Sequence, residues 1–151
     1  MTPRLKRRLP FVVMAAVLVV GCHAHLTPVG NLANVAGQIV DTADRLLTLA
    51  EQQHGLHVVT DQQLAAVAVA CDRIGREGQT LKAGIDAYTT AKTAGGDVSV
   101  QKAAITALVQ DIAEAVGQIG RAIPSGTVQQ IDTLVSNILD FVAQIRQGVQ
   151  E

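Results

Sequence analysis

The sequence predicts an all-α fold: an antiparallel up-down-up-down four-helix bundle that follows an N-terminal signal or anchor helix. Three observations lead to this prediction. Four blocks of apolar residues repeat at spacings that alternate between three and four positions, which places their side chains on one stripe of an α-helix. Short breaks rich in glycine, proline and capping residues separate the blocks, and short connections favour antiparallel neighbours. A basic and apolar leader precedes all four blocks.

The chain divides into three regions. Residues 1–21 are predicted to form a signal peptide, residues 22–30 a lipidated tether and residues 31–151 the bundle. Removal of the leader leaves positions 22–151, a length that suits a single domain. Within the bundle, the expected helices lie at about 31–53, 61–93, 99–122 and 127–149.

The leader combines a basic patch with a short apolar run. Four basic residues within positions 4–8 precede ten consecutive apolar residues, Phe11 to Val20, and Gly21 stands before Cys22. A membrane-spanning helix needs roughly 20 apolar residues. A signal peptide needs an apolar region of roughly 7–15 residues and a small residue at its cleavage site. The leader therefore predicts a cleaved signal peptide, with an uncleaved N-terminal membrane anchor as the alternative.

The four residues Val19-Val20-Gly21-Cys22 resemble the lipobox of bacterial lipoproteins, which has an aliphatic residue at −3, a small one at −1 and cysteine at +1. The resemblance covers only the leader and Cys22. It implies diacylglyceryl transfer to the Cys22 thiol, cleavage between Gly21 and Cys22, and acylation of the new amino terminus. His23 stands where lipoproteins of the inner membrane commonly carry Asp, which implies an outer-membrane location facing the periplasm if the host is Gram-negative.

The chain has two cysteines, Cys22 and Cys71. A disulfide between them is one alternative in an oxidising compartment, and two unmodified thiols are another. Cys71 falls on the apolar stripe of the segment 61–93, where a thiol behaves as a small hydrophobe. We therefore favour lipidation of Cys22, because two or three acyl chains make a stable anchor.

The four apolar stripes predict the core residue by residue. Further apolar residues beside the stripes, such as Leu47, Val109, Val116 and Leu139, widen them and favour a globular bundle over a two-stranded coiled coil. The predicted core positions are Leu32, Val35, Ile39, Thr42, Leu46 and Leu49; Leu64, Val67, Cys71, Ile74, Gly78, Leu81, Ile85 and Tyr88; Ile105, Leu108, Ile112, Ala115, Ile119 and Ala122; and Val128, Ile131, Val135, Ile138, Val142, Ile145 and Val149.

Local signals mark the ends of the segments. Gly55 suits the left-handed position that closes a helix, and Thr60 is a good N-cap with Gln63 at the third helical position. Pro124 disfavours helix at the residue before it. The other expected caps are Ser99 for the third helix and Ser125 or Thr127 for the fourth.

Three glycines, Gly75, Gly78 and Gly84, lie inside the segment 61–93. Each costs about 1 kcal/mol relative to alanine within a helix. Three interpretations remain open: the helix kinks near Gly75 and Gly78, these glycines allow a neighbouring helix to approach closely, or they form a functional hinge.

Composition excludes several function classes. The leader holds four of the 12 basic residues and none of the 13 acidic ones, so the remaining chain has a net charge of −5. A domain of that sign without a clustered basic patch is a poor candidate for binding nucleic acid. Outside the leader the aromatic residues are Tyr88 and Phe141, so stacking platforms for bases or sugars are not expected.

The sequence predicts no metal site and no cofactor. A di-iron bundle needs Glu-x-x-His pairs, which the chain lacks. His54 and His57, with Glu51 upstream and Asp61 downstream, are weak candidates for zinc ligands. Solvated loop histidines are the simpler interpretation.

No catalytic residues are predicted either. The carboxylate pairs Asp41/Asp44 and Asp111/Glu114 are each three residues apart, but acid–base catalysis requires a desolvated cleft and shifted pKa values. We expect both pairs, and Asn137, to lie on solvated faces.

These observations favour a non-enzymatic, lipid-anchored helical bundle of the bacterial cell envelope with a structural or protein-interaction role. The expected partners are the membrane, through the lipid on Cys22, and another envelope protein or a second copy of the chain. Two alternatives stay open: a ligand- or metal-binding helical module, and the same bundle on an uncleaved N-terminal anchor.

Overall fold

The computed structural model describes residues 28–150. They form four helices: α1 (Pro28–Gly55), α2 (Asp61–Thr93), α3 (Ser99–Ala122) and α4 (Gln129–Gln150). Within this part of the chain there is no β-strand, so the all-α class is confirmed for it. The predicted signal peptide, together with Gly21 and Cys22, lies outside the described residues.

The bounds of α2 and α3 coincide with the predicted ranges, whereas those of α1 and α4 differ. The first helix begins three residues earlier than expected and ends two later, and the fourth begins two later and ends one later. Proline is common at the first position of a helix, so Pro28 suits the earlier start of α1.

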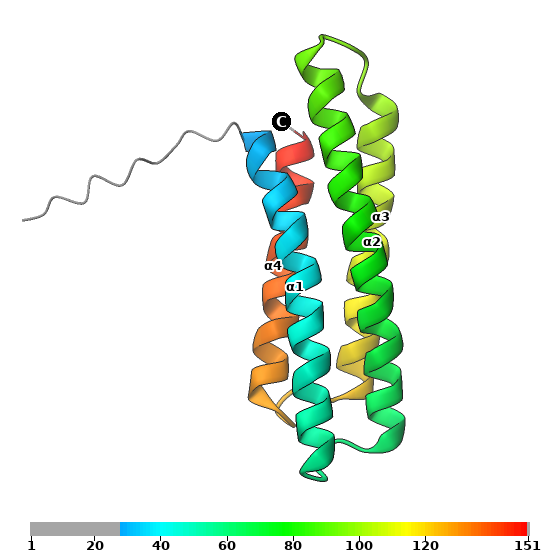
Figure 1. The fold of residues 1–151 in the computed structure, drawn as a ribbon, viewed down its shortest axis with the longest axis vertical. Coiled ribbons are helices and arrows are strands. Elements are labelled where there is room, and N and C mark those ends of the chain that lie inside the picture. The colour runs from blue at the N-terminus through cyan, green and yellow to red at the C-terminus, as the bar shows by residue number, and fades with distance from the viewer. Residues whose placement is uncertain (1–27, 151) are drawn as a thin grey trace, which may run out of the picture.

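The four helices lie side by side along the long axis of the molecule (Figure 1). Among the described residues, α1 and α3 each pack against both α2 and α4, whereas the backbones of the diagonal pairs, α1 with α3 and α2 with α4, nowhere come within 8 Å of each other between Cα atoms. Figure 1 shows the α1–α2 and α3–α4 loops at one end, which we name the distal end. The other end, named the proximal end, holds the start of α1, the α2–α3 loop and the end of α4.

The apolar stripes form one core. Every predicted stripe position is buried or half-buried, so the seven-residue pattern identified the core correctly. Full burial of a valine, leucine or isoleucine side chain stabilises the fold by roughly 1.5–3 kcal/mol relative to leaving it exposed. Leu139, expected to widen the stripe of α4, is instead 42% exposed. The largest fully buried side chains include Ile39, Leu46, Ile74, Leu81, Ile85, Tyr88, Ile105, Ile112, Ile119, Ile131 and Ile138.

The start of α2 carries the predicted cap. Thr60 Oγ1 accepts from the Gln63 N–H at 3.3 Å, and Gln63 Oε1 accepts from the Thr60 N–H at 2.9 Å. The Gln63 amide also donates from Nε2 to the carbonyl of Ala122 at 3.0 Å. One side chain therefore satisfies the first turn of α2 and the last turn of α3.

The predicted left-handed residue at the end of α1 is wrong. His57, with φ 61°, takes that conformation, and Gly55 does not. The reason is that turns of hydrogen bonds continue past Gly55: the Leu56 N–H donates to Gln52 O and the His57 N–H donates to His54 O.

The predicted caps of α3 and α4 are also wrong. Val98 occupies the N-cap of α3 without a side-chain bond. Asp97 binds the start of this helix instead, and its carboxylate accepts from the Ser99 N–H at 2.9 Å and the Ser99 hydroxyl at 3.0 Å. These bonds lower the pKa of Asp97.

At α4 the Asp132 carboxylate accepts from the Gly126 N–H at 2.8 Å. This bond braces the α3–α4 loop, where Gly126 has φ 86°. Neither Ser125 nor Thr127 uses its side chain as a cap within the described residues.

The glycines of α2 differ in their surroundings. A methyl group at Gly78 would lie 2.7 Å from Val40 Cγ2, whereas one at Gly75 would meet no atom within 4 Å. The helix runs without interruption from Asp61 to Thr93. Gly78 therefore lets α1 approach α2 closely.

Candidate functional site

The predicted lipidation site is close in sequence to the proximal end. Cys22 precedes the first residue of α1, Pro28, by six positions. Six residues of fully extended chain span at most about 20 Å. Anything attached to Cys22 is therefore held within that distance of the proximal end, which makes this end of the bundle the first place to look for a site.

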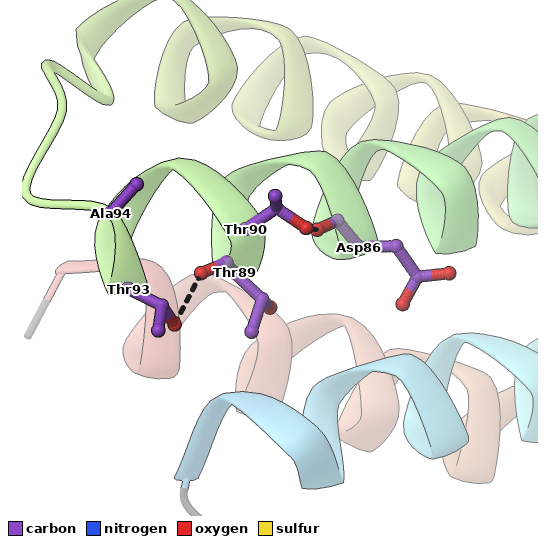
Figure 2. Close-up of a pocket in the computed structure, with 5 residues that line it drawn as sticks. All are labelled: Asp86, Thr89, Thr90, Thr93 and Ala94. Atoms are coloured by element: carbon purple, nitrogen blue, oxygen red, sulfur yellow. Dashed lines mark hydrogen bonds between the residues drawn. The ribbon is translucent and has the colours of Figure 1, made fainter.

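The last turns of α2 border an open depression of about 510 Å³ at the proximal end (Figure 2). Asp86, Thr89, Thr90, Thr93 and Ala94 line it. The three threonine hydroxyls donate to the carbonyls four residues earlier, at 2.8 to 2.9 Å. Their protons are thus engaged within the helix, and no base accepts them, so the depression presents a mostly apolar surface and its lining residues include no activated nucleophile.

Two lysines flank a buried tyrosine next to this surface. Lys92 Nζ of α2 lies 5.5 Å from the centroid of the Tyr88 ring, and Lys102 Nζ of α3 lies 6.0 Å from it. Ammonium groups at such distances are attracted by the ring quadrupole. Two ammonium groups, one from α2 and one from α3, therefore lie near the Tyr88 ring at the proximal end. Sequence reasoning missed this cluster, and its one local signal was the four-residue spacing between Tyr88 and Lys92.

Charge is distributed unequally between the two ends. With each helix divided at its midpoint and Glu77 at the middle of α2 left out, the proximal half of the described chain has four basic and four acidic residues. The distal half has four basic and seven acidic residues. The basic residues of the proximal half are Lys82, Lys92, Lys102 and Arg146. The negative charge of the described residues is therefore concentrated away from the start of α1.

The two histidines considered as zinc ligands lie at the distal end. His54 Nε2 contacts Asp61 Oδ1 at 2.6 Å, across the α1–α2 loop. His57 is exposed at the left-handed position. Within residues 28–150, no three side chains of His, Cys, Asp or Glu come together in a metal-binding cluster. The His54–Asp61 contact closes the loop between two helices.

The carboxylate pairs lie on the outside of the bundle. Asp111 pairs with Arg73 of α2 at 3.2 Å, and Glu114 is exposed. Asp41 and Asp44 are exposed on α1. Asn137 is exposed as well, as expected. None of these residues lines a desolvated cleft of the kind that acid–base catalysis requires.

Cys71 lies in the seam between α1 and α2. Only 4% of the residue is exposed, and its thiol is unpaired in the described part of the chain. Burial raises the pKa of Cys71 to about 12, and the nearby Asp44 carboxylate adds to the shift. The thiolate is the reactive form of cysteine, so this protonated thiol is inert at neutral pH.

None of the four helices of residues 28–150 has the length and apolar character to cross a bilayer. Comparison of the chain with known protein families, with curated proteins and with solved structures gave no match.

Proposed function

We propose that this protein is a lipoprotein of the bacterial cell envelope whose helical bundle has a structural or protein-interaction role and no enzymatic activity. The observation that carries the proposal is the sequence Val19-Val20-Gly21-Cys22 directly after a basic patch and ten apolar residues. In this proposal the signal peptide is cleaved between Gly21 and Cys22. The Cys22 thiol is acylated, and residues 23–27 join the lipid to α1.

The arrangement of the described residues supports a non-catalytic role. Its core is almost entirely aliphatic, and within the described part the buried residues bring only three polar groups into it: the hydroxyls of Thr42 and Tyr88 and the thiol of Cys71. The Thr42 hydroxyl donates to the Gln38 carbonyl at 2.6 Å. The carboxylates considered for catalysis are exposed or face an arginine. This chemistry suits a rigid spacer or docking body better than an enzyme.

The same proposal includes the up-down-up-down arrangement, in which consecutive helices are antiparallel. Loops at alternating ends of the bundle support it (Figure 1). So does the contact of each described helix with its two neighbours only. With four helices, this arrangement puts the start of α1 and the end of α4 at the same end.

The test is the intact mass and detergent partitioning of the wild-type chain and the Cys22→Ser variant, both expressed in a bacterial host. We expect the wild type to begin at Cys22, to carry the mass of two or three acyl chains, and to enter the detergent phase. The variant should lack the acyl mass and remain in the aqueous phase.

Two results would contradict the proposal. If both proteins keep residues 1–21 and enter the detergent phase, an uncleaved N-terminal anchor replaces the lipid. If the wild type is cleaved but carries no acyl mass, Cys22 is a free thiol or a disulfide partner. Reaction with a thiol reagent before and after reduction separates these last two cases.

A further inference from the structure

We propose that the tip of the α2–α3 hairpin at the proximal end is a contact surface for the anionic phospholipid headgroups of the membrane in which Cys22 is anchored. The tip consists of residues 88–102. This inference rests on the proposed function, because the lipid on Cys22 is what holds the bundle near the bilayer.

The hairpin is the part of the bundle that reaches furthest at the proximal end (Figure 1). The close contact of Gly78 with Val40 aligns the two helices. From this contact to the proximal end, α2 runs from Gly78 to Thr93, and α1 runs from Val40 to its first residue, Pro28. The stretch of α2 is the longer of the two, by roughly 5 Å at a rise of about 1.5 Å per residue. The α2–α3 loop extends beyond that point.

The anchor keeps this tip within reach of the bilayer. The five residues between Cys22 and Pro28 make six residue-to-residue steps, which allow at most about 20 Å between the lipidated residue and the start of α1. A hairpin that projects past the start of α1 is therefore the first part of the bundle to meet the membrane when the long axis stands upright.

Charge favours this orientation. The proximal half of the described chain is neutral, and the distal half carries the excess of acidic residues. A bilayer with anionic lipids attracts basic groups and repels acidic ones near its surface. Electrostatic repulsion of the distal half therefore favours an orientation in which the distal end points away from the membrane and the proximal end faces it.

The tip has two basic residues, Lys92 and Lys102, and one acidic residue, Asp97, so its net charge is +1. Lys92 and Lys102 are held near one ring, that of Tyr88, so two ammonium groups are available for phosphate oxygens. Val100 follows the loop and is 76% exposed, the most exposed large apolar side chain of the described residues. A basic pair beside an exposed valine suits the boundary between headgroups and acyl chains, where apolar side chains enter and cations remain at the phosphates.

The experiment places a nitroxide label on the acylated, full-length mature protein in vesicles that contain phosphatidylglycerol. One variant is Val100→Cys. The matched control is Val69→Cys, because Val69 is 68% exposed and lies in the distal half of the same hairpin. Cys71 is buried and therefore remains unlabelled, and acylation blocks Cys22. The collision rate of each label with a water-soluble nickel complex measures its exposure to water.

We expect membrane binding to reduce the collision rate at position 100 by at least about threefold, because interfacial burial of roughly 5–10 Å removes a side chain from bulk water. The rate at position 69 should not change. Vesicles of phosphatidylcholine alone should give less protection at position 100. The double variant Lys92→Gln/Lys102→Gln should reduce the protection, whereas Arg45→Gln/Arg121→Gln at the distal half should not.

Equal collision rates at positions 100 and 69 in the acylated protein would overturn the inference and leave the proposed function intact. Protection of position 100 that is already present in the non-acylated Cys22→Ser chain lacking residues 1–21, in buffer without detergent or vesicles, would also overturn it, since a second protein copy would then cover the tip. Unchanged protection in the lysine variant would overturn the role of Lys92 and Lys102. An intact mass without acyl chains would instead contradict the proposed function, and the inference with it.

Discussion

Besides Thr42, two buried side chains, Tyr88 and Cys71, carry polar atoms into a core that is otherwise aliphatic. The Tyr88 hydroxyl is fully buried and has no hydrogen-bond partner within the described residues. The Cys71 thiol lies in the α1–α2 seam beside Asp44. Each atom makes a distinct contribution to the free energy of unfolding, and each contribution can be measured by a single substitution.

Removal of the Tyr88 hydroxyl is expected to stabilise the bundle. A buried polar group without a partner costs about 1–3 kcal/mol in lost hydration. The Tyr88→Phe variant keeps the ring and its two lysine neighbours, so its free energy of unfolding should rise by about 1 kcal/mol. Urea unfolding followed by circular dichroism measures the change.

The control for this prediction is Tyr88→Leu. It removes the hydroxyl and the ring together, and it should lower the free energy of unfolding by about 1–3 kcal/mol through lost packing and lost cation–π contacts. A loss of stability in Tyr88→Phe as large as in Tyr88→Leu would mean that the hydroxyl is hydrogen-bonded.

Cys71 should make the stability fall at high pH. Its pKa is raised from 9.0 to about 12 in the folded protein, so the unfolded chain loses this proton first as the pH rises. The stabilisation from the buried thiol is therefore complete below about pH 9 and is lost as the pH rises towards 12. Urea unfolding of the wild type and Cys71→Ala at pH 7 to 11 tests this.

The difference in stability between the two proteins isolates Cys71 from the other titrating groups. Cys71→Ala carries a constant penalty for its smaller side chain, and the advantage of the wild type should shrink steadily above pH 9. A constant difference across this range would contradict the prediction.

At the scale of the helices, Gly75 and Gly78 of α2 differ in what surrounds them. Gly75 has open space where a methyl group would stand, and Gly78 faces Val40 at 2.7 Å. Valine is restricted at χ1, so Val40 has little freedom to turn away.

Alanine substitutions at these two positions should have opposite effects. Gly75→Ala is expected to raise the free energy of unfolding by about 1 kcal/mol, because alanine is the better helix former. Gly78→Ala should lower it by about 1–2 kcal/mol, since the cost of overpacking exceeds the gain in helix propensity. Thermal and urea unfolding of both variants measures the changes. Stabilisation by both substitutions would show that α1 and α2 move apart at no cost.

For the molecule as a whole, the four described helices form one hydrophobic core. Its buried residues run from Leu32 to Val149 and are contributed by all four helices and by the α1–α2 and α3–α4 loops. A Cys22→Ser chain that lacks residues 1–21 is therefore expected to keep the helix content of the acylated protein and to unfold in one cooperative step. Circular dichroism during thermal unfolding checks both expectations. A loss of helix in the shortened chain would mean that the leader supports the fold.

The sequence alone determined the class of the fold, the stripe of each helix and the cap at Thr60. These features depend on neighbours within one or two turns, and the alternation of threes and fours in residues such as Ile74, Leu81 and Ile85 places them on one face whatever surrounds them. It also supplied the evidence for the proposed anchor at Cys22.

At most helix ends the sequence offers several residues that could serve as the cap, and only the tertiary structure shows which of them does. His57 rather than Gly55 takes the left-handed position, and Asp97 rather than Ser99 binds the start of α3. Alternative hydrogen bonds at helix ends differ little in energy, so packing and loop length select among them. Three further features could not be predicted from the sequence: the close approach at Gly78, the pair of lysines near Tyr88 and the projecting hairpin. They arise where segments far apart along the chain meet, and the relative positions of packed helices are fixed by the fit of their side chains.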